Sequence, residues 1–151
     1  MKRVIASILA AAAVLSMVIV VAARAKPVVN VGREGLALKG YDAVAYVIDG
    51  RPAAGRAEFE HRWNGALWRF VSAANRDRFV QSPDRYAPQF GGYCAYAVSR
   101  GYTADIDPAA WKIVDGKLYL NYSRRVQTLW ERDLHANIAK AAANWPAVLG
   151  K

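Results

Sequence analysis

The chain has 151 residues, of which 54% are hydrophobic and 11% aromatic, and its formal net charge at pH 7 is +9. This length suits one compact domain with a core of its own, and the absence of internal repeats, low-complexity tracts and linkers from the sequence excludes a repeat protein or a chain of several domains. The basic residues are spread along the sequence, which is typical of a solvated basic face. The alternative, more specific interpretation is that they bind an anionic membrane surface or an acidic partner.

The N-terminal segment predicts export. Met1-Lys2-Arg3 is a short basic start, residues 4–23 are apolar and uncharged, and Ala23-Arg24-Ala25 is a typical cleavage site. We therefore expect residues 1–25 to be a signal peptide and the mature protein, residues 26–151, to be periplasmic or otherwise exported. The apolar run is long enough to span a bilayer, which requires about 20 residues, so an uncleaved anchor is the alternative and the only basis for a membrane contact. Export argues against a nucleic-acid partner.

The first half of the mature chain predicts an extended lead-in over residues 26–39, followed by a short helical turn capped by Asp42. A β-hairpin comes next. Phe59, His61 and Trp63 alternate with charged residues, which is typical of a half-buried strand, and Asn64-Gly65 is a strong signal for a two-residue type I′ turn. The return strand carries the chain to Ser72, which we expect to cap a helix running to about residue 81.

The second half repeats this logic. Residues 111–114 and 117–122 are predicted strands, and Asp115-Gly116 between them predicts a second hairpin. Ser123 is expected to cap one long C-terminal helix, because apolar residues recur there every four positions: Val126, Trp130, Leu134, Ile138 and Ala142. The predicted fold class is α+β, a small single domain of two β-hairpins packed with short helices and a long C-terminal helix.

Several segments of the sequence carry a resemblance to a known family. Residues 70–79 and 82–86, with the hairpin segment 63–69 before them, resemble the YHS domain. The segments 40–46, 91–96 and 104–108 are similar to the exported bacterial YHS proteins of about this length. The resemblance covers nearly all of the mature chain and implies a YHS-like domain over residues 26–151.

The resemblance argues against a soft-metal site in this chain and in favour of redox chemistry. It implies a link to metal handling in cysteine-rich members, but the two family cysteines fall here on Val71 and Asn75, which cannot supply thiolates to a soft metal. We therefore expect no metal site of that type, no cofactor and no retained stoichiometric zinc. The exported branch includes selenocysteine proteins, and we expect that position to match Cys94, which favours redox chemistry.

Cys94 is the single cysteine, and an odd cysteine in an exported protein indicates either a reactive thiol or an intermolecular bond. Gly91-Gly92 precede it and residues 95–99 are expected to begin a helix, whose N-terminus would lower the thiol pKa below that of free cysteine. The competing interpretation is a small buried apolar residue. No Cys-x-x-Cys motif is present, so a dithiol cycle within the chain is excluded.

The candidate surroundings of Cys94 are Tyr93, Tyr96, Asp105 and His61. His61 also fits a core or cleft histidine, and Asp105 fits either a cation ligand or an acid–base group together with Asp107, which we expect to be a helix cap. The mature chain is rich in tyrosine, which is compatible either with core and rim packing or with a ligand cleft: Tyr41, Tyr46, Tyr93, Tyr96, Tyr102, Tyr119 and Tyr122.

No sequence signature of a familiar enzyme class is present, so whether the protein is an enzyme stays open. Two hypotheses follow. In the first, Cys94 acts in redox chemistry or binds a soft metal transiently. In the second, the protein is a non-catalytic binding module that presents an aromatic groove to a small ligand or a partner protein.

Overall fold

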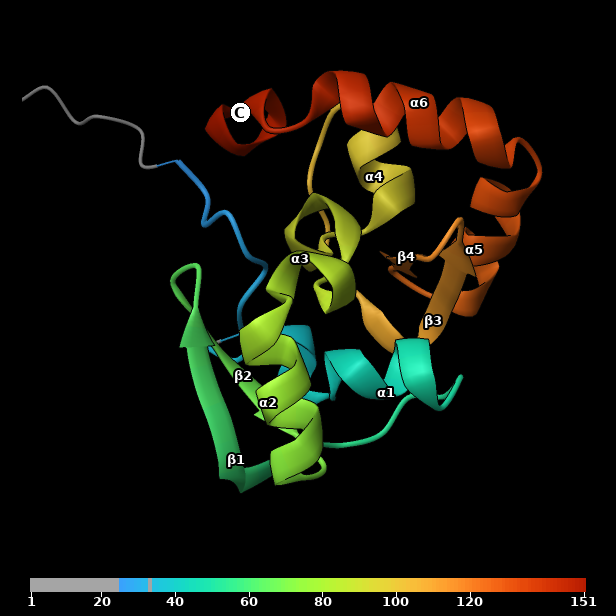
Figure 1. The fold of residues 1–151 in the computed structure, drawn as a ribbon. Coiled ribbons are helices and arrows are strands. Elements are labelled where there is room, and N and C mark those ends of the chain that lie inside the picture. The colour runs from blue at the N-terminus through green and yellow to red at the C-terminus, as the bar shows by residue number, and fades with distance from the viewer. Residues whose placement is uncertain (1–24, 33) are drawn as a thin grey trace, which may run out of the picture.

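The computed structural model describes residues 25–32 and 34–151. The predicted signal peptide or anchor, apart from its last residue, lies outside these described residues. Within them the predicted α+β class is confirmed: two separate antiparallel hairpins and six α-helices form one small domain (Figure 1). Over the same residues, no helix combines the length and the apolar character that a membrane crossing requires.

The elements fall into two groups along the chain. The first group is η1 (Leu38–Gly40), α1 (Ala43–Ile48), β1 (Arg56–Trp63), β2 (Ala66–Phe70), α2 (Ala73–Gln81) and α3 (Pro83–Tyr86). The second group is η2 (Gln89–Gly92), α4 (Ala95–Ser99), β3 (Asp107–Val114), β4 (Lys117–Asn121), α5 (Arg124–Glu131), α6 (Leu134–Asn144) and η3 (Ala147–Gly150).

Both predicted hairpin turns are confirmed. Asn64 and Gly65 have φ values of 51° and 77°, and Asp115 and Gly116 have φ values of 50° and 73°. Positive φ at both central residues defines the type I′ turn, whose twist matches that of the flanking strands. The turns therefore fix the register of each hairpin.

The outer end of each hairpin is irregular, which the sequence did not predict. The register shifts between Arg56 and Glu60 in β1, and between Asp107 and Trp111 in β3. Asp107 therefore begins a strand, and the expectation of a helix cap there was wrong. Its Oδ1 still accepts a hydrogen bond from the Ala109 backbone N–H, at 2.9 Å, which is a local turn contact.

The lead-in packs along the first hairpin. The Ala37 N–H donates to the Leu67 carbonyl at 2.9 Å, and the Leu67 N–H donates to the Gly35 carbonyl at 3.0 Å. Nearer its start, the Lys26 N–H donates to the carbonyl of Leu149 at 2.8 Å. The segment therefore connects the first hairpin with the C-terminal end of the domain, as the blue trace in Figure 1 shows.

Asp42 caps α1 as predicted, and it does more. Its fully buried carboxylate accepts four hydrogen bonds: from Val44 N (2.8 Å) and Ala45 N (3.2 Å) in α1, and from Val71 N (2.9 Å) and Asn75 Nδ2 (2.8 Å) at the end of the first hairpin and in α2. One side chain thus joins α1 to both β2 and α2. A buried carboxylate without hydrogen-bond donors would be costly, and here each oxygen has two.

The long C-terminal helix was predicted as one element, and the structure divides it into α5 and α6. Asp133 between them has φ −139° and ψ 58°, which is not helical. The break leaves the Trp130 carbonyl without its helical partner, and the buried Asn137 side chain donates to that carbonyl at 2.9 Å. The bend lets α5 pack beside β3 while α6 crosses over α4 (Figure 1).

The predicted apolar stripe follows this bend only in part. Trp130 is fully buried, and Val126, Leu134 and Ile138 are half-buried. Ala142 is exposed and its neighbour Ala141 is buried in its place. Two cores result: one lies around the first hairpin and its helices, and the other lies among α4, α5, α6 and η3. The strand β4 contributes to both, with Leu118 and Leu120 in the first and Tyr119 in the second.

Candidate functional site

Cys94 lies directly before α4, so the predicted helix start is confirmed. Its side chain is buried, with 1% of its surface exposed. The sulfur accepts a hydrogen bond from the Tyr122 N–H at 3.3 Å and donates one to Asn121 Oδ1 at 3.6 Å. The thiol is therefore held between the start of α4 and the end of β4.

Asn121 fixes the direction of the thiol proton. It is completely buried, and its Oδ1 also accepts from the Tyr96 N–H at 3.2 Å. Because that contact requires an oxygen, the amide orientation is determined and the Cys94 sulfur faces an acceptor. The Asn121 Nδ2 group has no partner among the described residues. This arrangement suits the neutral thiol, since a thiolate would face an oxygen lone pair.

The pKa of Cys94 follows from the same geometry. Burial raises the pKa of the thiol, and hydrogen bonds from the backbone N–H groups of Ala97, Tyr122 and Tyr96 lower it by less. The expectation of a lowered pKa was therefore wrong. The helix start is present, but α4 has only five residues, so its dipole is too small to offset the desolvation.

A pocket of about 280 Å³ opens beside the thiol. We call it the Cys94 pocket. Its lining is mostly apolar and aromatic and comes from three stretches of chain: Cys94, Tyr96 and Ala97; Tyr102 and Ala104; and Tyr122 and Val126. Tyr102 and Tyr122 are 53% and 59% exposed. Large aromatic surfaces left in water around a pocket are typical of a binding site.

Tyr96 is the one predicted neighbour that lines the Cys94 pocket. Its ring lies 4.8 Å from the Arg100 guanidinium carbon, and Arg100 also donates to the Tyr96 hydroxyl at 2.9 Å. These contacts fix the ring orientation from the solvent side. Tyr96 can therefore present a preformed aromatic surface to a ligand.

The other two aromatic candidates lie elsewhere. Tyr93 donates through its hydroxyl to the Pro27 carbonyl at 2.8 Å and packs against Trp145, so it holds the lead-in. His61 lies on β1 and packs edge-to-face against Phe79, with ring centroids 6.4 Å apart. Neither side chain lines the Cys94 pocket.

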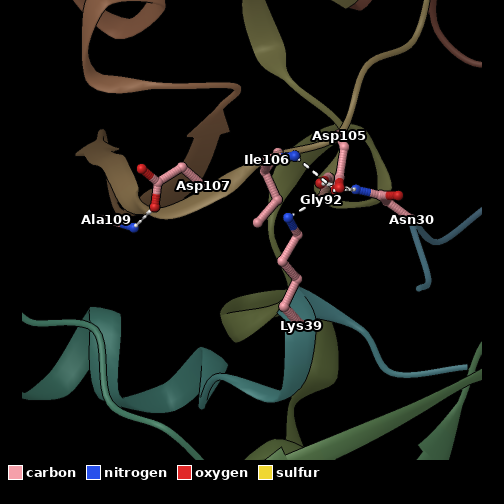
Figure 2. A network of polar contacts seen from close by, with 7 residues as sticks. All are labelled: Asn30, Lys39, Gly92, Asp105, Ile106, Asp107 and Ala109. Atoms are coloured by element: carbon pink, nitrogen blue, oxygen red, sulfur yellow. Dashed lines mark hydrogen bonds and ion pairs between the residues drawn. The ribbon is translucent and has the colours of Figure 1, made fainter. Parts of the chain in front are cut away.

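Asp105 does not line the Cys94 pocket and takes part in a separate polar network (Figure 2). Its Oδ2 lies 3.0 Å from Lys39 Nζ, and its Oδ1 accepts from Asn30 Nδ2 at 3.2 Å and from the Ile106 N–H at 2.8 Å. Burial acts to raise its pKa, but the bond from Ile106 and those from Lys39 and Asn30 outweigh it and lower the pKa. Asp105 thus ties the lead-in and η1 to the segment before β3.

This pKa shift predicts a pH-dependent stability difference. A carboxyl with a lowered pKa in the folded state stabilises the protein above the unfolded pKa of about 3.9, and that contribution disappears as the pH falls through the folded pKa. Asp105→Asn should therefore cost less than about 1 kcal/mol at pH 7, since the ion pair is half exposed. Urea unfolding of both proteins should show the difference closing as the pH falls below about 3.9 and through the lower pKa of the folded state. A difference that is unchanged at acid pH would contradict it.

Metal ligands do not gather in the described residues. Across residues 25–32 and 34–151, no group of three or more His, Cys, Asp or Glu side chains is placed to hold a metal ion. Val71 and Asn75, the positions of the family cysteines, lie instead next to the Asp42 carboxylate. A site formed by Cys94, His61 and a carboxylate is not assembled in this arrangement.

Sequence reasoning missed part of the site. The strand pattern did not predict that Asn121 contacts the thiol, and the helix stripe did not predict that Val126 lines the pocket. The available signal was the end of β4, where a polar residue follows the apolar run and is followed by an aromatic residue and a helix cap. Comparison with known proteins adds no further residues: no family model, curated protein or solved structure matches this chain.

Proposed function

We propose that this protein is a binding module and that its ligand site is the Cys94 pocket. The observation that carries the proposal is the cluster of Tyr96, Tyr102 and Tyr122 around a mostly apolar hollow, with a buried thiol in its wall. A volume of about 280 Å³ is small for a ligand pocket, since typical ones hold roughly 300–1,000 Å³. The ligand class that fits is a small, largely apolar molecule with one aromatic ring.

Thiol chemistry at Cys94 is the second candidate. The observation in its favour is that the Tyr122 N–H donates to the sulfur at 3.3 Å and that Cys94 lies directly before α4, and both features would help to stabilise a thiolate. In this version Cys94 acts in redox chemistry or binds a soft metal transiently.

The surroundings of the sulfur favour binding over thiol chemistry. The side chain is almost completely buried, its burial raises the pKa, and its proton has an acceptor in Asn121. A nucleophilic thiol requires an accessible thiolate. The neutral, hydrogen-bonded thiol instead contributes a polarizable wall to an apolar pocket.

Family and location complete the proposal. We propose that the domain is YHS-like and acts outside the cytoplasm, as the sequence resemblance and the predicted signal peptide imply.

Binding of phenol as a probe tests the pocket. Tyr122→Ala should weaken phenol binding about fivefold, since aromatic pairs are worth about 0.5–1.5 kcal/mol. NMR titration of the folded protein measures this. Ile48→Ala is the matched control, because Ile48 is a similarly exposed hydrophobic residue outside the pocket. Equal affinities of wild type and Tyr122→Ala would contradict the proposed site.

Alkylation of Cys94 separates the two candidates. With iodoacetamide at pH 7, the folded protein should react at least about tenfold more slowly than the protein unfolded in guanidinium, and phenol should slow it further. Fast alkylation of the folded protein at neutral pH would instead support thiol chemistry. Cys94→Ser should retain the fold in either case.

A further inference from the structure

A second pocket, of about 190 Å³, lies where four distant parts of the chain meet. We call it the Trp pocket. It is formed by the lead-in at Val28 and Val29, the turn of the first hairpin, the α3–η2 segment, and Trp145 after α6. It shares no lining residue with the Cys94 pocket.

Its walls are unusually rich in tryptophan. Trp63 and Trp68 line the hollow with ring centroids 5.7 Å apart, and Phe90 and Trp145 line it at 6.1 Å. Trp68 and Phe90 are buried, so the half-buried Trp63 and Trp145 offer the accessible rings. Three of the five tryptophans of the chain thus line one small hollow. Among aromatic side chains, tryptophan attracts a cation to its face most strongly.

The charge of the pocket has one sign. Asp84 is the only charged residue among those that line it, and no Lys, Arg or His is present there. Asp84 is exposed and forms no ion pair with another described residue. The local charge of this hollow therefore favours a cation over an anion, against the net positive charge of the whole chain.

The wall formed by the lead-in is preformed. Gly91 has φ +61°, and a Cβ built at this position would lie 1.9 Å from the Val28 carbonyl oxygen, so only glycine allows the two backbones to approach. The Asn30 N–H donates to the Gly91 carbonyl at 2.8 Å. A ligand would therefore enter a hollow whose shape is already set, which reduces the entropic cost of binding.

We propose that the Trp pocket binds a small organic cation of the quaternary ammonium class. The cation lies against the rings of Trp63 and Trp145, and the exposed Asp84 supplies the opposite charge. A metal ion is not suited to this pocket, because one carboxylate and four aromatic rings do not make an oxygen ligand set. A quaternary ammonium group needs no hydrogen-bond partners and is recognised by such aromatic cages.

Choline and its uncharged analogue 3,3-dimethyl-1-butanol test the proposal with the folded protein. Calorimetric titration and tryptophan fluorescence should show choline binding about tenfold more tightly than the alcohol. Asp84→Asn should weaken choline binding about threefold and leave binding of the alcohol unchanged. Asp49→Asn is the control, since Asp49 is exposed and lies outside the pocket.

Each outcome decides the matter. Equal affinities for choline and the alcohol would overturn the proposal and leave an apolar hollow without charge selection. The absence of choline binding at millimolar concentration would overturn it altogether. An unchanged affinity in Asp84→Asn would also overturn it, because the charge at the rim would then have no effect. Failure of this test leaves the Cys94 pocket unaffected, because phenol binding is measured at a different site.

Discussion

Asp42→Ala is expected to cost at least about 3 kcal/mol of the free energy of unfolding. The substitution removes the acceptor of four hydrogen bonds and leaves three N–H groups without partners, those of the buried Val44 and Ala45 and of the half-buried Val71. A hydrogen bond to a charged group contributes about 1.5–3 kcal/mol, and loss of an N-cap alone costs about 0.5–2 kcal/mol. Thermal and urea unfolding should show a fall in melting temperature on the order of 10 °C.

Another aspartate at the N-terminus of a helix, Asp133, provides the control for Asp42. Asp133 precedes α6 in the same way, but it is exposed and its side chain makes no capping hydrogen bond. Asp133→Ala should therefore change stability by no more than about 0.5 kcal/mol. Asp42→Asn should lose about as much stability as Asp42→Ala, because the new amide N–H groups would face the donors of Val71 and Asn75. Similar losses at both aspartates would mean that the buried network contributes little.

Trp130→Ala is expected to cost about 3–5 kcal/mol. Trp130 is completely buried, and its ring packs on Tyr119 with centroids 5.5 Å apart in the core beneath α5 and α6. Truncation leaves a cavity that these rigid neighbours cannot fill. Because a small domain is stable by only about 5–15 kcal/mol, much of its stability would be lost. Equilibrium unfolding in urea measures the change, and an unchanged melting temperature would contradict it.

Trp130→Phe separates ring packing from hydrogen bonding at this position. The Trp130 Nε1 group is buried and has no partner among the described residues, so the indole carries a desolvation cost. Phenylalanine removes that donor while it keeps an aromatic ring. Its loss of stability should therefore be less than half that of the alanine variant. An equal loss in both variants would indicate that the indole N–H is satisfied by water.

Local signals explain why the hairpins were predictable. Asn64-Gly65 and Asp115-Gly116 demand positive φ at two successive residues, and few structures other than a type I′ turn satisfy that demand. The caps Asp42, Ser72 and Ser123 were predictable for a similar reason, because each side chain satisfies a backbone N–H within three residues.

The break between α5 and α6 depends on contacts far apart in sequence and was not predictable from periodicity. Four-residue spacing continues through Leu134, but α5 must cover β3 while α6 covers α4, and one straight helix cannot do both. Asn137 was the available hint. A polar residue in an apolar stripe needs a buried partner, and here it is the carbonyl released by the break.

The candidate site was predictable only at its centre. The lone cysteine drew attention to Cys94, and helix propensity placed it correctly before α4. Its pKa could not be predicted, because burial by Tyr122 and Val126 comes from elements about 30 residues away in the sequence. Local sequence therefore indicated the thiol, while tertiary packing decided its chemistry.

The contact between the lead-in and the C-terminus has a consequence for the order in which the molecule folds. Lys26 donates through its side chain to the Lys151 carbonyl, 125 residues further along the chain. Since synthesis proceeds from the N-terminus, this loop cannot close until residue 151 has left the ribosome. Closing so long a loop also carries a large entropic cost before any contact repays it. The hairpins can form early, whereas the wall that Val28 and Trp145 give to the Trp pocket is completed last.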